Sequence, residues 1–266
     1  MRSLVLLALA SAALRAADVP EILATEDGVR FGLWPHRPAQ AAPIVFVLSG
    51  AIDDSLTSRY FRQAAQFLIE DGIVCVSVDL PCHGQDSRPK DSGLGGWRAR
   101  AVAGNDFVAD VTTRLRKVLD HLIKSGIADP QRIAALGTSR GGFVALHFAA
   151  ADTRVKAVMG FAPLIDLAKI SEFRGAEDDP LVQKLALEKQ ADALAGRSVW
   201  LVIGDRDARV STDATIAFAR AVTAASLAKS LPALVDLHVI AEPKGHTVPA
   251  GTAELGAKWL REKLLK

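Results

Sequence analysis

The sequence has few cysteines and no strong imbalance of charge. Its 266 residues include two cysteines and carry a formal net charge of +2. Runs of five or more like charges are absent. The composition therefore gives no reason to expect nucleic acid or an anionic membrane surface as a partner. A small neutral or mildly charged ligand is the remaining expectation.

The two cysteines are poorly placed for a disulfide bond. Cys75 lies inside the apolar run GIVCVSVDL, and Cys82 follows shortly after it. An extended chain rises about 3.3 Å per residue, so continuing the strand to Asp79 exceeds the roughly 7 Å that a disulfide allows between Cα atoms. We therefore expect two free thiols, with Cys75 packed in the core. Neither has the glycine-rich surroundings of a nucleophile.

Long apolar runs are also missing, but the N-terminus has the layout of a secretory signal peptide. One basic residue, Arg2, precedes an apolar stretch over residues 4–14, and small residues follow. This stretch is shorter than the roughly 20 residues needed to span a bilayer. We predict a signal peptide over residues 1–16, a mature domain over residues 17–266, and export to the periplasm or medium. The alternative, an ordinary N-terminal helix, is disfavoured because the run has no amphipathic period.

Apolar runs of strand length alternate with helical patterns along most of the chain. The runs that predict strands are 43–50, 73–80, 132–137, 155–163, 198–205 and 235–243. The patterns that predict helices are 58–72, 106–126, 141–151, 212–230 and 251–265. Buried strands separated by helices indicate a mostly parallel sheet with right-handed crossovers and helices on both faces. Residues 20–38 add a leading antiparallel pair, giving an eight-stranded α/β sheet, and residues 171–180 form a loop or small cap.

A serine stands between glycines where a predicted strand changes into a helix. The segment is Gly137-Thr138-Ser139-Arg140-Gly141. In open α/β sheets, reactive groups gather outside the carboxyl ends of the strands. A serine on such a sharp turn projects its hydroxyl clear of the sheet, and side chains at the glycines would collide with the turn. The pattern predicts a nucleophile elbow; the alternative is a glycine-rich turn with an incidental serine.

From about Pro20 to the C-terminus, the chain resembles the α/β-hydrolase superfamily. The resemblance implies the α/β-hydrolase fold and a catalytic triad in the order serine, acid, histidine. Asp207 occupies the position of the acid in the spacing Gly204-x-x-Asp207-x-x-Val210. The neighbouring Asp205 is expected to hold the loop, and Asp166 is a less favoured substitute.

His246, in the segment KGHTVP after the last predicted strand, occupies the position of the family's histidine. As general base it would take the Ser139 proton and return it to the leaving group. The other histidines fall in predicted strands or helices, or before a proline. His83, in DLPCHGQDS, matches a family turn that organises backbone near the site, with Cys82 in place of the usual glycine.

The resemblance also implies an oxyanion hole made by two backbone N–H groups. One belongs to Arg140, directly after the nucleophile, and the other to Ala51 in the loop Leu48-Ser49-Gly50-Ala51. A His-Gly-Gly-Gly run is absent, which disfavours the lipase-like branch. The Arg140 side chain either pairs with a nearby acid, which is favoured, or reaches a negative group of the substrate.

The lead-in DPQRI is similar to that of dienelactone-hydrolase-like and prolyl-oligopeptidase-like members. The former typically use cysteine at the elbow, and the latter carry a propeller domain for which this chain has no room. We therefore expect a serine hydrolase that acts on a carboxylic ester by acyl-enzyme chemistry. A small peptidase, a thioesterase, a cofactor-free haloperoxidase with the same triad, or a non-catalytic binding protein are the alternatives.

The expected partner is a small-molecule ester or acyl substrate, and the oligomeric state stays open. The sequence contains no metal-ligand cluster, Rossmann glycine fingerprint or P-loop, so we expect neither a metal nor a cofactor. Trp97, Arg98 and Arg100 either line the pocket or lead into the following helix, and the second interpretation is favoured.

The N-terminal pattern yields a testable expectation. Expressed in a bacterial host with its leader, the protein should appear in the periplasm or medium, shortened between about Ala12 and Ala17. Both Ala10-Ser11-Ala12 and a cut after Ala16 are candidate cleavage points. N-terminal sequencing of the exported protein checks this, and recovery of intact Met1 in the soluble cytosol would contradict it.

Overall fold

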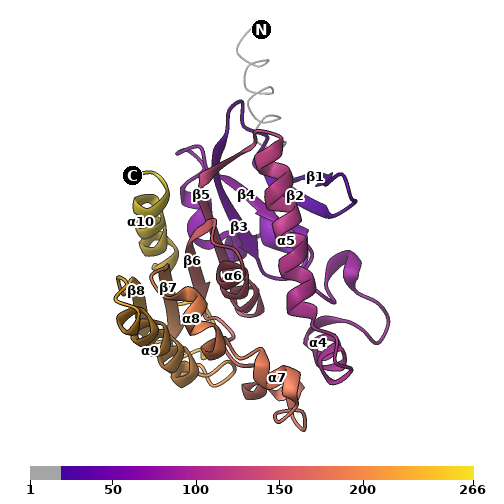
Figure 1. The fold of residues 1–266 in the computed structure, drawn as a ribbon, viewed down its shortest axis with the longest axis vertical. Coiled ribbons are helices and arrows are strands. Elements are labelled where there is room, and N and C mark those ends of the chain that lie inside the picture. Colours follow the sequence, from indigo (N-terminus) through magenta and orange to yellow (C-terminus); the bar gives the residue numbers. More distant parts are fainter. Residues whose placement is uncertain (1–18) are drawn as a thin grey trace, which may run out of the picture.

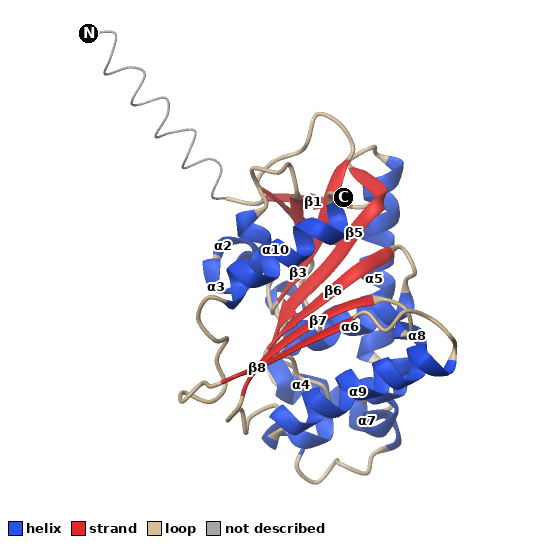
Figure 2. Ribbon diagram, turned by 90° about the vertical axis from the view of Figure 1, so that its left-hand side faces the viewer, coloured by secondary structure: helices blue, strands red, loops and turns tan. Residues whose placement is uncertain are grey.

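The computed structural model describes residues 19–266, whose strands form one twisted sheet with helices on both faces (Figures 1 and 2). Within this range the eight strands are β1 (Glu21–Ala24), β2 (Arg30–Trp34), β3 (Ala42–Leu48), β4 (Val74–Ser77), β5 (Ala128–Thr138), β6 (Val155–Phe161), β7 (Ser198–Gly204) and β8 (Val235–Ile240). Their order across the sheet is β1-β2-β4-β3-β5-β6-β7-β8. The predicted signal peptide, residues 1–16, lies outside the described residues.

The pairing of the strands confirms the expected mostly parallel α/β sheet. β1 pairs with β2 and β2 with β4 in antiparallel orientation, as expected for the leading segment. From β4 to β8 every neighbouring pair is parallel. Parallel strands end at the same edge of the sheet, so the loops that follow β3, β5, β7 and β8 are brought toward one another.

Helices cover both faces because the parallel strands are apolar on both sides. The helices of the described residues are α2 (Ile52–Thr57), α3 (Arg59–Arg62), α4 (Gly93–Val102), α5 (Phe107–Lys124), α6 (Arg140–Ala151), α7 (Pro180–Lys184), α8 (Ala191–Leu194), α9 (Thr212–Ala228) and α10 (Thr252–Leu264). Figure 2 shows α2, α3 and α10 on one side of the sheet and α5, α6, α8 and α9 on the other. Every residue of β3 is buried, and two apolar clusters fill the space between the sheet and each helix layer.

The expectation of one helix over residues 58–72 was wrong. The segment forms the short helix α3 and then a 3₁₀ turn over Gln63–Phe67, because Gln63 has a positive φ of 43°. The preceding side chain, Arg62, is buried, and its guanidinium lies 4.0 Å from the centre of the Trp34 ring. The helical spacing of apolar residues over 58–72 therefore correctly indicated a buried face. The helix itself ends after one turn, where the buried Arg62 packs on Trp34.

Two further helical pieces lie at one end of the sheet in Figure 1, namely α4 and α7. The helix α4 was not expected from the sequence. It contains Trp97, which is fully buried. Short 3₁₀ turns at Leu167–Lys169 and Ser171–Phe173 lead toward α7, so the polar stretch 171–180 belongs to a small cap, one of the two forms expected for it.

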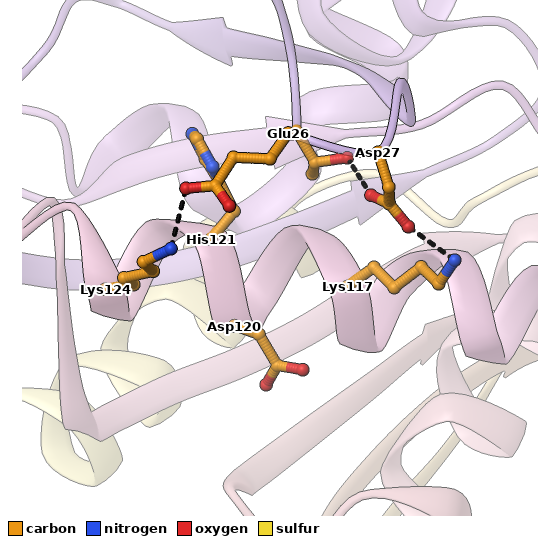
Figure 3. A pocket seen from close by; sticks show the side chains of 7 residues that line it. Glu26, Asp27, Lys117, Asp120, His121 and Lys124 are labelled. Atoms are coloured by element: carbon orange, nitrogen blue, oxygen red, sulfur yellow. Dashed lines mark hydrogen bonds and ion pairs between the residues drawn. The ribbon is translucent and has the colours of Figure 1, made fainter.

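The turn between β1 and β2 is fastened to α5 by ion pairs (Figure 3). Lys124 pairs with Glu26 at 2.6 Å, and Lys117 pairs with Asp27 at 2.5 Å. These groups line a pocket of about 240 Å³, and all four side chains are about half exposed or more. Such pairs contribute little stability, and their charges are already matched. We therefore interpret this pocket as the place where the β1–β2 turn packs on α5, and not as a ligand site.

Candidate active site

The turn that carries Ser139 is sharp and strained. β5 ends at Thr138, α6 begins at Arg140, and Ser139 between them has φ 54° and ψ −118°. Residues other than glycine adopt a positive φ only at an energetic cost, so the surrounding structure must hold the turn. The Ser139 N–H donates to Phe161 O at 3.0 Å, and the Ser139 carbonyl accepts from Leu164 N–H at 3.0 Å. The elbow is thus fixed to the end of β6.

The glycines around Ser139 allow the elbow to pack directly on its neighbours. A Cβ on Gly137 would overlap the backbone of Gly141. A Cβ on Gly141 would overlap the carbonyl of Leu48, at the end of β3. The two positions therefore exclude a side chain for different reasons: the first closes the turn, and the second places the start of α6 against the loop that follows β3.

The structure brings Ser139, His246 and Asp207 together into one chain of hydrogen bonds. His246 Nε2 lies 3.0 Å from Ser139 Oγ, and His246 Nδ1 lies 2.7 Å from Asp207 Oδ2. A carboxylate can only accept, so Nδ1 carries the proton and Nε2 is free to accept the serine proton. The Asp207 side chain is fully buried, whereas 29% of the His246 side chain is exposed.

The loop after β7 fixes Asp207 in this position. Its second oxygen, Oδ1, accepts from the N–H groups of Arg209 at 3.0 Å and Val210 at 3.1 Å. The two N–H donors hold the carboxylate in this orientation. This arrangement leaves Oδ2 for His246.

The two other candidate acids contact backbone groups instead of His246. Asp205 Oδ1 accepts from the N–H of Glu242 at 2.9 Å and so joins the loop after β7 to the loop after β8. Asp166 Oδ1 accepts from the N–H of Ala168 at 2.9 Å and caps a 3₁₀ turn. Of the three aspartates, Asp207 is the one that touches His246.

The loop that carries His246 is held from α3. Gly245 has a φ of 76°, which turns the chain just before the histidine. The hydroxyl of Tyr60 accepts from the N–H of Val248 at 3.2 Å. No sequence pattern predicts this contact, because the two residues are 188 positions apart and belong to no common motif.

A buried aspartate, Asp79, connects the turn containing His83 to the loop after β3. Its Oδ1 accepts from the N–H of Ile52 at 2.9 Å, and its Oδ2 accepts from the N–H of Gln85 at 3.2 Å and from Arg30 at 2.9 Å. Asp79, the first residue of the motif DLPCHGQDS, thus holds the turn to the loop after β3, in addition to the contacts made by His83.

His83 has the contacts of a residue that organises the turn. The Pro81 carbonyl accepts from His83 Nδ1 at 2.8 Å and from Trp97 Nε1 at 2.6 Å. Burial lowers the pKa of His83, and Arg140 lowers it further, so the ring is neutral. Trp97 therefore supports this turn from within α4, while Arg100 pairs with Asp86 and Asp91.

The two predicted oxyanion-hole N–H groups, of Ala51 and Arg140, have no hydrogen-bond acceptor within residues 19–266. The next N–H in the first loop, from Ile52, is occupied by Asp79. Ala51 and Arg140 are thus available as donors at the two sides of the elbow. Their convergence on one substrate oxygen stays a prediction.

Cys75 and Cys82 are both free, as expected, and Cys75 is buried in the core as predicted; Cys82 is buried as well. Burial raises the pKa of each thiol to about 12. The Cys82 thiol also donates to Asp91 Oδ1 at 3.0 Å. Because the thiolate is the reactive form, a protonated buried thiol is a poor nucleophile.

A cavity of about 530 Å³ lies beside the loop of Asp207. Its lining joins the cap to the acid loop and consists of Ala168, Lys169, Ile170, Ser171, Arg174, Glu177, Ala208 and Arg209. Arg209 pairs with Glu172 of the cap at 2.5 Å. Within residues 19–266, no group of three or more His, Cys, Asp or Glu side chains is placed to hold a metal ion. The same residues contain no helix that is both long and apolar enough to cross a membrane.

A mostly parallel eight-stranded sheet with a serine elbow between β5 and α6 defines the α/β-hydrolase superfamily as the class of this protein. The model of the Esterase family, described as "Putative esterase", matches residues 21–241. The chain belongs to this family and is a hydrolase. The match includes Ser139 and Asp207 and ends shortly before His246.

Solved structures agree on the fold. TT1662 from Thermus thermophilus matches with a TM-score of 0.70 at 18% identity, covering 93% of this chain and 98% of that one. Est1E from Butyrivibrio proteoclasticus matches with a TM-score of 0.64 at 19% identity, covering 92% and 99%. The acylaminoacyl peptidase of Pyrococcus horikoshii matches with a TM-score of 0.70 at 15% identity, covering 93% of this chain and 42% of the peptidase. No curated protein sequence matches the chain.

The packing of the elbow on β3 can be tested with two glycine variants. Gly141→Ala should lower the free energy of unfolding by about 2 kcal/mol or more, because the new methyl group overlaps the Leu48 carbonyl and must displace backbone. Gly95→Ala is the control, since a Cβ there meets nothing within 4 Å and alanine favours the helix α4. Chemical denaturation measures both, and equal stability of the two variants would contradict the close approach.

Proposed function

We propose that the protein hydrolyses carboxylic esters through an acyl-enzyme formed on Ser139, with His246 as general base and Asp207 as its partner. The main support is the continuous chain of hydrogen bonds from Ser139 Oγ through both ring nitrogens of His246 to Asp207 Oδ2. It stands on a strained elbow at the carboxyl edge of the sheet, where a substrate can approach. Membership of the Esterase family supports an ester as the substrate.

The geometry supports a definite sequence of proton transfers. His246 Nε2 takes the Ser139 proton as Oγ attacks the acyl carbon, and Asp207 stabilises the imidazolium that forms. The N–H groups of Arg140 and Ala51 are the donors for the negative oxygen of the tetrahedral intermediate. His246 then donates the proton to the departing alcohol. Water repeats the cycle on the acyl-enzyme and frees Ser139.

The same three residues would also serve a peptidase, a thioesterase or a cofactor-free haloperoxidase. A panel of matched ester, thioester and aminoacyl amide substrates separates these activities by their kcat/KM values. The signal peptide predicted over residues 1–16 supports the further proposal that the enzyme acts after export, in the periplasm or medium. A non-catalytic binding protein is disfavoured because all three side chains are in hydrogen-bond contact.

The nucleophile and its base should act as a unit. Ser139→Ala and His246→Ala should each reduce ester hydrolysis about 10⁶-fold, and the double variant should lose little more. A fluorophosphonate should modify Ser139 only when His246 is present, because a serine hydroxyl without a base is a weak nucleophile. Ser125→Ala, at an exposed serine after α5, is the control that should leave rate and labelling unchanged. A double variant with wild-type activity, or a label on Cys82, would refute the proposal.

The two aspartates of the acid loop provide a matched pair of variants. Asp207→Asn should reduce turnover about 10⁴-fold with the fold intact, because the imidazole loses the partner that fixes its tautomer and stabilises its charge. Asp205→Asn should cost far less, because Asp205 contacts the Glu242 N–H and not His246. Steady-state kinetics and circular dichroism measure both. The reverse order of effects would show that Asp205 is the catalytic acid.

A further inference from the structure

The side chain of Arg140 folds back onto the loop that carries Ala51. Arg140 follows the nucleophile, and its Nε donates to Ser49 O at 2.9 Å. A Cβ built on Gly50 would lie 3.3 Å from Arg140 Nη2 and 3.3 Å from the His83 ring. The guanidinium is therefore half-buried against the loop expected to bind the substrate oxygen.

This guanidinium has no counter-ion. The expectation that Arg140 pairs with a nearby acid was wrong: no carboxylate within residues 19–266 reaches ion-pair distance, and Nη1 and Nη2 have no acceptor there. Burial lowers the pKa of Arg140, and the positive charge of Arg209 lowers it further. Arg100 and Arg154, which are also partly buried, each have two carboxylate partners.

The nearby acids do not neutralise Arg140. Glu172 and Asp54 act on it electrostatically, because both raise its pKa. Glu172, however, is already paired with Arg209 at 2.5 Å. Asp54 is exposed on α2 and does not reach the guanidinium. The residue that follows Ser139 therefore carries a half-buried cation whose Nη1 and Nη2 groups have no acceptor within residues 19–266.

An unpaired, partly desolvated guanidinium gains most from an anion that arrives with two oxygens in its plane. A carboxylate fits this better than a dianionic phosphate. One guanidinium matches the single charge of a carboxylate but leaves one charge of a dianionic phosphate unmatched, and the neighbouring Arg209 is already bound to Glu172. The free Nη groups lie against the loop of Ser49 and Gly50, which leads to Ala51, so we expect an anion bound there to belong to the molecule whose acyl carbon Ser139 attacks.

We propose that Arg140 selects esters whose acyl or alcohol part carries a carboxylate, which binds to its free Nη groups. This inference rests on the proposed ester hydrolysis. Arg140 thus has two separate functions. Its backbone N–H donates to the developing oxyanion, and its guanidinium binds the carboxylate of the substrate.

Two pairs of isosteric esters test the selection and separate the acyl from the alcohol side. The acyl pair is the mono-4-nitrophenyl ester of adipic acid and the same ester with the free carboxylate replaced by a primary amide. The alcohol pair is 4-acetoxybenzoate and 4-acetoxybenzamide. The wild type should prefer the carboxylate in at least one pair by about 10- to 100-fold in kcat/KM, the range typical of a charge-assisted hydrogen bond. Equal rates within both pairs would overturn the proposal.

The variant Arg140→Met should abolish this preference, and Arg140→Lys should retain part of it, because lysine keeps the charge without the fork. Arg220→Met, which removes one exposed positive charge from α9, is the control and should keep the preference. If Arg140→Met lowers kcat/KM equally for both members of a pair, the side chain only supports the loop through Ser49 O, and the proposal fails.

A second pair of variants leaves Arg140 in place. Asp54→Asn removes a negative charge that acts on Arg140, so it should increase the preference for the carboxylate several-fold. Asp53→Asn, at the adjacent exposed position, should not. An unchanged preference in Asp54→Asn would argue against a carboxylate at Arg140.

Binding to Ser139→Ala separates this inference from the proposed function, since it needs no turnover. By calorimetry, Ser139→Ala should bind the intact carboxylate ester at least 10-fold more tightly than its amide analogue, and Ser139→Ala/Arg140→Met should bind both alike. Tight, charge-selective binding without wild-type turnover would refute ester hydrolysis and keep the anion site. Turnover of both esters with equal affinities would keep the hydrolase and refute the anion site.

Discussion

The close approach of Gly141 to the carbonyl of Leu48 is the constraint on which the rest of the site depends. It lets α6 start directly above the end of β3, so that the nucleophile and the loop of Ala51 become neighbours. The strain at Ser139 follows from it, because the chain must turn within one residue to enter α6. The same approach brings the Arg140 side chain to Ser49 O, across 91 residues of sequence.

The order of the strands supplies the remaining members of the site. β5, β6, β7 and β8 are successive parallel neighbours, so the loops after β5, β7 and β8 leave the same edge. Hydrogen bonds then restrict the conformations of these loops. Asp205 joins the loop after β7 to Glu242, and the backbone of Arg209 and Val210 holds Asp207. His246 is thereby placed between a fixed acid and a fixed serine.

Different charged residues near Ser139 serve the proposed reaction and the proposed choice of substrate. The proposed triad needs one buried carboxylate, and Asp207 supplies it with hydrogen bonds to both of its oxygens. The cap contributes the Arg209–Glu172 pair, which is already neutral. Arg140 has no carboxylate partner within residues 19–266, so the proposed choice of substrate, rather than the proposed reaction, depends on it.

The sequence by itself determined the sheet, the elbow and the order of the candidate residues, because these depend on local patterns. Buried parallel strands need continuous apolar runs, and the elbow needs glycines at fixed spacing around Ser139. Only the tertiary structure decided which groups Tyr60 and Arg140 contact, where the helix over residues 58–72 breaks, and that Arg140 meets no carboxylate within the described residues 19–266. These features arise from contacts between residues 91 and 188 positions apart and from burial. No local pattern encodes them, since each is fixed only when the sheet brings distant loops to one edge.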